Sequence, residues 1–279
     1  MLDVKVERIQ KNSAKIFRMS TLDPQNKPIL WVSSYLIDGL LIDFGHPHAK
    51  DEFLRVVNLD EVEKCVLSHH HEDHIGACHD LINKHDIPIF ATKETAFLSR
   101  CRINIPPERM ITWGIPNPFE AKILSNTKTI KTKKAKFKII HSPGHCKNLI
   151  SFFHLEKKYL FSTDSFISED QNVIFNWENA LKMLETFQIF KSLNPKYIFL
   201  ENGRVITVNE LDKLINFWTK IKIKSQKLYK NGLNPRKIMK TIFGKESWLK
   251  TATGGDMSRE NLIRSLLGLP AVFKRKIRK

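Results

Sequence analysis

The sequence KCVLSHHHEDHIG, residues 64–76, decides the fold of this chain. Its first five residues predict a short β-strand that ends at Ser68, and a helix is predicted for residues 75–85. Five potential metal ligands lie between these two elements: His69, His70, His71, Asp73 and His74. Imidazole nitrogens and carboxylate oxygens are the usual ligands of zinc and related divalent metals. The pattern therefore predicts a metal site at the carboxyl end of a strand, where open α/β sheets bind ligands.

The composition of the chain indicates a globular protein. Of 279 residues, 42% are hydrophobic and 27% are charged, which is typical of a globular protein. No stretch approaches the roughly 20 uncharged apolar residues that cross a bilayer, so we expect no membrane association. The N-terminus lacks the pattern of a signal peptide, and the four cysteines form no CxxC pair. We therefore expect a cytoplasmic protein.

Strand and helix patterns alternate along the first 200 residues. Asp38-Gly39, between apolar runs at 31–37 and 40–44, is a typical two-residue signal for a β-hairpin. Further strands are predicted at 87–91, 136–141, 149–154, 158–162 and 197–200, with an amphipathic helix at 177–193. This alternation predicts an α/β fold with two β-rich regions.

The C-terminal part differs in composition, and we divide the chain into a catalytic domain, 1–208, and a basic helical region, 209–279. Helices are predicted at 209–231, 235–243 and 258–267. Residues 218–279 hold 17 Lys and Arg against three acidic residues, a local charge of +14 out of the total of +17. Such a region is typical of surfaces that bind nucleic acid, although solvated lysine-rich helices give the same pattern. Both interpretations stay open.

The spacing His-x-His-x-Asp-His of residues 69–74 resembles the signature of the metallo-β-lactamase superfamily. Further segments are similar to that family's motifs and occur in its order: SYLI (34–37), LIDFG (41–45), HSPGH (141–145) and LFSTD (160–164). The resemblance covers residues 35–205. It implies an αββα sandwich with metals at one edge, followed here by a small C-terminal helical extension.

The resemblance also implies roles for single residues. One metal would be held by His69, His71 and His145, and a second by Asp73 and His74, with Asp164 bridging the two. The metal would be Zn²⁺, one or two ions, with iron or manganese as alternatives. Two neighbouring cations lower the pKa of a shared water and polarise the electrophile. Asp73 would act as a catalytic residue by orienting the attacking hydroxide.

The sequence departs from the family pattern at Asn202. In the segment YIFLENGRVI, residues 197–206, Asn202 stands where the family carries a further histidine ligand. An amide offers only a neutral oxygen, which is a poor ligand for zinc. Three alternatives stay open: a weakened second site, ligation of a harder metal through the oxygen of Asn202 or Glu201, or a partial loss of activity. We favour the weakened second site.

Several functions are compatible with this pattern. We expect a metal-dependent hydrolase of small ester, thioester or lactone substrates, resembling the glyoxalase II and lactonase branches. One alternative is a phosphodiesterase or ribonuclease that binds nucleic acid through the basic C-terminal region. Others are a mononuclear iron dioxygenase of the persulfide type and a non-catalytic binding module. The sequence does not indicate an oligomeric state.

Overall fold

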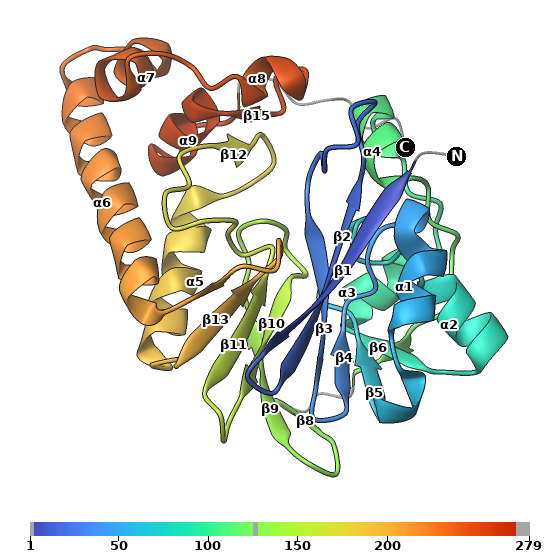
Figure 1. Ribbon diagram of the computed structural model, residues 1–279. Coiled ribbons are helices and arrows are strands. Elements are labelled where there is room, and N and C mark those ends of the chain that lie inside the picture. Colours follow the sequence, from blue (N-terminus) through green and yellow to red (C-terminus); the bar gives the residue numbers. More distant parts are fainter. Residues whose placement is uncertain (1–2, 125–127, 272–279) are drawn as a thin grey trace.

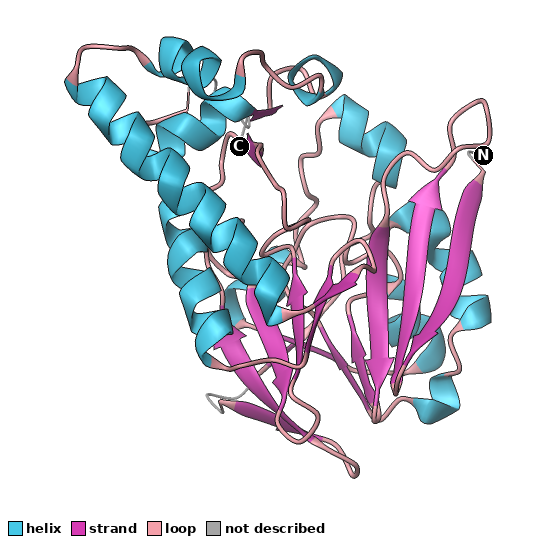
Figure 2. Cartoon of the chain, turned by 60° about the vertical axis from the view of Figure 1, so that its left-hand side comes forward, coloured by secondary structure: helices cyan, strands magenta, loops and turns pink. Residues whose placement is uncertain are grey.

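The computed structural model describes residues 3–124 and 128–271 of the chain. Two β-sheets face each other, and helices cover the outer face of each sheet (Figures 1 and 2). This arrangement is the αββα sandwich expected from the sequence, and the predicted α/β class is confirmed. Among the described residues, none of the helices is both long enough and apolar enough to cross a membrane.

The first sheet comes from the N-terminal half of the chain. Its strands pair in sequence order, antiparallel from β1 to β4 and parallel from β4 to β7. They are β1 (Val4–Lys11), β2 (Ala14–Thr21), β3 (Val32–Ile37), β4 (Leu40–Ile42), β5 (Lys64–Val66), β6 (Ile89–Ala91) and β7 (Lys122–Ile123). The helices that accompany it are α1 (Lys50–Val56), α2 (Cys78–His85), α3 (Lys93–Leu98) and α4 (Pro107–Trp113).

The hairpin between β3 and β4 forms where the sequence predicts it. Asp38 and Gly39 both have positive φ, 46° and 86°, as a two-residue hairpin turn requires. The turn pairs Ile37 with Leu40 and Tyr35 with Ile42. On its other side β4 pairs in parallel with β5. The carboxyl ends of both strands therefore lie beside the metal-ligand loop that follows β5.

The second sheet has the order β14-β13-β11-β10-β9-β8. It is antiparallel except where β11 pairs with β13, and α5 (Ala180–Ser192) lies between these two strands in the sequence. The strands are β8 (Thr129–Lys131), β9 (Lys136–His141), β10 (Ile150–His154), β11 (Tyr159–Thr163), β13 (Tyr197–Leu200) and β14 (Val205–Ile206).

Apolar side chains fill the space between the sheets. Tyr35 from the first sheet contacts Phe161 and Phe199 from the second, with ring centroids 5.3 and 5.8 Å away. A second hydrophobic cluster joins the first sheet to its helices, and a third joins the second sheet to its helices. The three clusters fix the sheets and helices as successive layers, as a sandwich requires.

The C-terminal region packs on the second sheet. It comprises α6 (Val208–Lys230), α7 (Pro235–Phe243), α8 (Leu249–Ala252), β15 (Met257–Ser258) and α9 (Arg259–Leu266). The helices α6, α7 and α9 share one hydrophobic cluster with α5, and β15 pairs with β12 (Ile174–Phe175). The predicted division after residue 208 falls at the start of α6. The basic tail of the predicted region, residues 274–279, lies outside the described residues.

Trp218 joins this region to the sandwich. It is fully buried, its ring lies 5.6 Å from Phe187 of α5, and its indole N–H donates to the Gln171 carbonyl at 2.7 Å. We expect Trp218→Ala to lower the free energy of unfolding by about 3–5 kcal/mol, because it removes a large buried side chain. Urea denaturation measures this change. The matched variant Trp248→Ala alters a side chain that is 74% exposed and should change stability by about 0.5 kcal/mol or less. Equal effects of the two variants would contradict the prediction.

Candidate metal centre

The loop that follows β5 carries four of the six predicted metal ligands, His69, His71, Asp73 and His74. Both ends of this loop are tied to the residues after β4. The Ser68 backbone N–H and hydroxyl each donate to the carboxylate of Asp43 at 2.7 Å. The Phe44 N–H donates to the carbonyl of His74 at 2.9 Å. The loop is therefore held at the carboxyl ends of β4 and β5.

Four of the predicted ligands converge in a first group. The ligand atoms of His69, His71, His145 and Asp164 all lie within 4.8 Å of one another. His71 Nδ1 and His145 Nε2 are 2.8 Å apart. Asp164 Oδ2 lies 3.5 Å from His69 Nε2 and 3.3 Å from His145 Nε2. Three imidazoles and one carboxylate thus surround a single position.

A second group lies on the other side of Asp164. It joins Asp73, His74 and Asp164, whose ligand atoms again lie within 4.8 Å of one another. Asp164 Oδ1 is 2.8 Å from His74 Nε2, and Asp73 Oδ2 is 3.8 Å from the same nitrogen. Asp164 therefore directs one oxygen to each group, so its placement is compatible with the predicted bridging role.

The donor set fits a metal ion. His69 Nε2 and Asp73 Oδ1 are buried and have no hydrogen-bond partner. A buried polar atom without a partner costs about 1–3 kcal/mol, and a bound cation would remove that cost. Imidazole and carboxylate donors suit zinc and also accept iron or manganese.

Burial determines the protonation of the first two histidines. It lowers the pKa of His69, with a further contribution from His74, and it lowers the pKa of His71 well below its ordinary value. Both rings are therefore neutral and keep a lone pair for a metal, as ligation requires.

The remaining charges balance around Asp164. Burial opposes a charge on His74 and on His145, but the surrounding carboxylates, with Asp164 the strongest, together outweigh it and raise the pKa of both rings. Burial likewise opposes the charge on Asp164, and His74, His69 and His145 nevertheless hold its pKa well below the usual range. A metal ion would displace protons from these rings and take over the neutralisation of the carboxylate.

The second ring nitrogens of three candidate ligands have partners outside the cluster. His145 Nδ1 lies 2.6 Å from Glu178 Oε1, and His74 Nδ1 lies 2.9 Å from Asp43 Oδ2. His69 Nδ1 lies 3.0 Å from the Ser68 hydroxyl. Such partners fix the orientation of a metal-binding imidazole. The sequence analysis did not identify Glu178, because no motif surrounds it.

Asn202 lies in the turn between β13 and β14. Its side-chain amide donates to the Ile167 carbonyl at 3.0 Å, and its side-chain oxygen accepts the Arg204 N–H at 3.1 Å. Both polar atoms of the amide are thus engaged in the surrounding loops. This arrangement offers no support for Asn202 as a metal ligand, and a role toward a substrate stays a prediction.

The segment that carries Glu178 is fastened to the C-terminal region. The Asn176 N–H donates to the Asp256 carbonyl at 2.8 Å. The Ala180 N–H donates to the Ser265 hydroxyl at 2.7 Å, and that hydroxyl donates to the Glu178 carbonyl at 3.3 Å. The C-terminal region therefore shapes the surroundings of the first group.

A cavity of about 800 Å³ lies beside the first group, between α4, the 175–181 segment and the end of α9. His70, His71 and Glu72 line it on the side of the cluster. Its apolar wall includes Ile103, Ile105, Phe175, Trp177, Leu181 and Leu269. Arg109 also lines it, with Nε 2.6 Å from Glu72 Oε1.

Comparison with known proteins assigns the chain to a family. Residues 31–200, more than half of the chain, match the Metallo-beta-lactamase superfamily. The chain therefore belongs to the metallo-beta-lactamase superfamily, which confirms the resemblance seen in the sequence. With its cluster of histidines and aspartates, it is a metal-dependent hydrolase.

Two solved structures show the same fold. A metallo-beta-lactamase from Pontibacter korlensis has a TM-score of 0.59 at 16% identity, and the match covers 76% of this chain and 98% of that one. A metallo-beta-lactamase family protein from Thermus thermophilus has a TM-score of 0.59 at 14% identity, with 90% of each chain covered.

Curated relatives are more similar in sequence. The beta-lactamase-like protein 2 homolog of Caenorhabditis elegans is 24% identical over 225 residues, which are 75% of this chain and 69% of that protein. A hydroxyacylglutathione hydrolase of Haemophilus influenzae is 28% identical over 145 residues, or 50% of this chain and 66% of that protein. A hydroxyacylglutathione hydrolase of Pectobacterium carotovorum is 27% identical over 114 residues, and the chain spans only 37% of its length.

Asp43 provides a test of the metal centre that leaves every predicted ligand in place. We expect Asp43→Ala to lower zinc affinity by about 10–100-fold, because His74 and Ser68 lose the carboxylate that orients them. Competition with a chromophoric chelator measures this affinity. Asp60→Ala, which removes an exposed carboxylate in the Leu59–Glu61 turn, serves as the control. Unchanged zinc affinity in Asp43→Ala would show that the carboxylate does not support the site.

Proposed function

We propose that the chain hydrolyses a small ester, thioester or lactone. The observation that carries this proposal is the cavity beside His71, whose volume of about 800 Å³ falls in the range typical of small-molecule sites. Its apolar wall suits an acyl chain. Three acidic residues, Glu72, Glu178 and Asp256, line it against one arginine, Arg109, a balance that does not favour a phosphodiester backbone. An uncharged acyl group therefore suits this cavity better than a nucleic acid strand does.

The proposal assigns roles to the residues of the cluster. His69, His71, His145 and Asp164 would hold one metal ion, with zinc as our first choice and iron or manganese as alternatives. Asp73 and His74 would hold a second ion only weakly, through the shared Asp164, because their group has fewer ligands than the first. A metal held there lowers the pKa of a bound water and polarises the scissile carbonyl.

Asp73 also has a catalytic role in this proposal. It is 8% exposed, and its Oδ1 has no hydrogen-bond partner. This oxygen is placed to accept a hydrogen bond from the attacking water and so to direct the water at the carbonyl carbon. Two of the relatives are named as hydroxyacylglutathione hydrolases, which supports a thioester as the first substrate to test.

A small substrate panel tests the proposal. We expect the zinc-loaded chain to hydrolyse S-lactoylglutathione, 4-nitrophenyl butyrate or a γ-lactone with a kcat/KM at least about 100-fold above that for bis(4-nitrophenyl) phosphate. The variant His69→Ala/His71→Ala, which lacks two candidate ligands, is the control for contaminating esterases. Metal content is measured on the same preparation. Turnover of the phosphodiester alone, or a protein that contains iron alone and oxidises a persulfide, would contradict the proposal.

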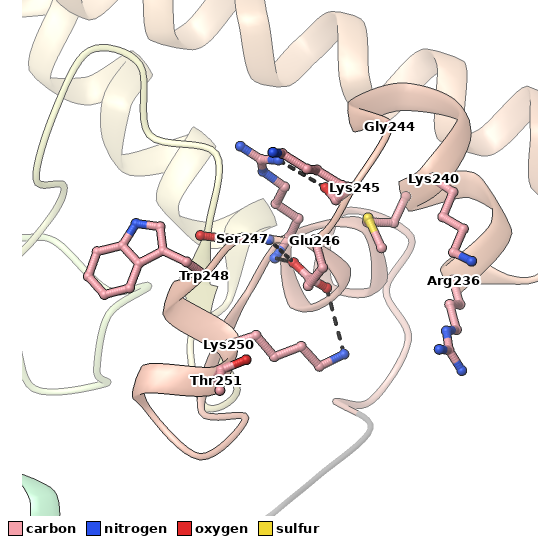
Figure 3. A pocket seen from close by; sticks show the side chains of 11 residues that line it. Arg236, Lys240, Gly244, Lys245, Glu246, Ser247, Trp248, Lys250 and Thr251 are labelled. Carbon is pink, nitrogen blue, oxygen red and sulfur yellow. Dashed lines mark hydrogen bonds and ion pairs between the residues drawn. The ribbon is translucent and has the colours of Figure 1, made fainter.

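A second candidate function is favoured by the distribution of charge. A cavity of about 840 Å³ in the C-terminal region is lined by Arg236, Lys240, Lys245, Lys250 and Arg259, with Glu246 as its acidic residue. Figure 3 shows Arg236 and Lys240 close together on one side of this cavity and Trp248 on the opposite side. Such clustered cations contact phosphate groups, and an exposed aromatic ring can stack on a base.

Two of these cations are already engaged. Lys250 Nζ lies 3.7 Å from Glu246 Oε2 and 3.5 Å from Glu260 Oε2, and the Arg259 guanidinium donates to Asn172. Among residues 3–124 and 128–271, no carboxylate lies within ion-pair distance of Arg236, Lys240 or Lys245. These three charges are available to a phosphate backbone, as the alternative of a phosphodiesterase or ribonuclease requires.

Charge reversal tests this second candidate. We expect Arg236→Glu/Lys240→Glu/Lys245→Glu to weaken the binding of a fluorescent 20-nucleotide single strand by at least about tenfold, measured by anisotropy at low salt. The control, Lys220→Glu/Lys224→Glu/Lys227→Glu, makes the same change of charge on exposed residues of α6. Equal weakening by both variants would show that only net charge matters. No binding by the unmodified chain at low salt would exclude this function.

A further inference from the structure

Arg109 lies between the cavity and the second group of candidate ligands. It belongs to α4, and its side chain lines the cavity beside His71 and Glu72. Its Nε is 2.6 Å from Glu72 Oε1, and its Nη2 is 3.7 Å from Asp73 Oδ1. The guanidinium carbon lies 5.5 Å from the centre of the Trp177 ring. An ion pair and an aromatic face thus fix the orientation of this cation.

The charges around Arg109 make it a permanent cation. Burial opposes its charge, but Glu72, Asp73 and Asp164 outweigh this effect and raise the pKa of the guanidinium. Glu72 itself is only 2% exposed, and burial raises the pKa of its carboxyl to about 7, although Arg109 acts to lower it. A guanidinium has five N–H donors, and the 3.7 Å separation of Arg109 Nη2 from Asp73 Oδ1 is longer than a hydrogen bond.

The second metal position is weak by comparison with the first. Among the described histidines, cysteines, aspartates and glutamates, its group contains only Asp73, His74 and the shared Asp164. The Asn202 amide is engaged with Ile167 and with the Arg204 backbone. The Arg109 charge beside Asp73 would further repel a second divalent cation.

We propose that Arg109 takes the place of a second metal ion, as a catalytic residue that contacts the carbonyl oxygen of the substrate. The inference rests on the proposed acyl hydrolysis. It also implies that the chain works with one metal ion, held by His69, His71, His145 and Asp164.

The reaction balances without any further group. The oxygen of water forms a bond to the carbonyl carbon, and the electron pair of the C=O bond moves onto the oxygen that Arg109 contacts. When that pair returns, the bond from carbon to the leaving oxygen or sulfur breaks. The leaving atom takes the electron pair of the bond that breaks, together with the proton that water gave up, which Asp73 holds in the interval. Arg109 keeps all of its protons and acts through its charge and its N–H donors.

Kinetics of position-109 variants form the first arm of the test. Loss of one preorganised donor beside the developing charge should lower kcat of Arg109→Met by about 10²–10³-fold, with metal content unchanged at one ion per chain. Arg109→Lys keeps the charge and should retain part of kcat. Guanidinium ion added to Arg109→Ala should restore part of kcat, a response that a purely structural role does not give. The matched control is Arg100→Met, which removes an exposed arginine paired with Glu120.

Cobalt titration forms the second arm and does not depend on activity. We expect the unmodified chain to bind one Co²⁺ tightly and a second weakly, and Arg109→Met to bind the second about tenfold more tightly, because a neighbouring positive charge is gone. Absorption and calorimetry follow both steps. Two equally tight Co²⁺ ions in the unmodified chain, or unchanged kcat in Arg109→Met, would overturn the inference. If no ester, thioester or lactone is turned over, the proposed function fails, while the cobalt titration still tests the effect of Arg109 on the second position.

Discussion

The carboxylate of Asp43 is the interaction on which the site depends. Asp43 directly follows β4 with a positive φ of 56°, and it is 1% exposed. One oxygen accepts the Ser68 N–H, and the other contacts the Ser68 hydroxyl and His74 Nδ1. A buried carboxylate is costly unless it is fully hydrogen-bonded, and here it has three partners. Those partners connect the ends of β4 and β5 with the candidate metal ligand His74. A change in the pairing of these two strands would therefore also move His74.

The sequence predicts those parts of the fold that depend on local signals. The hairpin at Asp38-Gly39 and the strand at Tyr197–Leu200 form where expected, because turn residues and apolar runs act over a few positions. The edge hairpin of β1 and β2 was not predicted. Residues of β1 are mostly exposed or half-buried, so β1 has no clear hydrophobic alternation. The helix α4 also escaped prediction, since it spans only two turns.

Some residues of the candidate site could likewise be predicted from local motifs, and others could not. All six predicted metal ligands converge in the structure, because the motif places four of them in one turn and the resemblance supplies His145 and Asp164. Glu178 and Arg109 could not be found from the sequence. Each reaches the cluster through contacts with residues more than 30 positions away, and single charged residues in loops and short helices carry no pattern. The sequence likewise reports the charge of the C-terminal region but not its role in forming the cavity wall.

The two-stranded ribbon of β12 and β15 has a consequence for how a substrate would be received. Together with the hydrogen bonds from Asn176 to Asp256 and from Ala180 to Ser265, it ties the segment around Trp177 to the C-terminal region through the protein's own contacts. A binding loop that is already ordered spares the complex the loss of conformational entropy that closing a flexible lid entails. Affinity would therefore depend on how well a molecule matches a preformed shape, so this enzyme should be selective rather than adaptable. A change in the C-terminal helices, far along the chain from the histidines, would alter which molecules match.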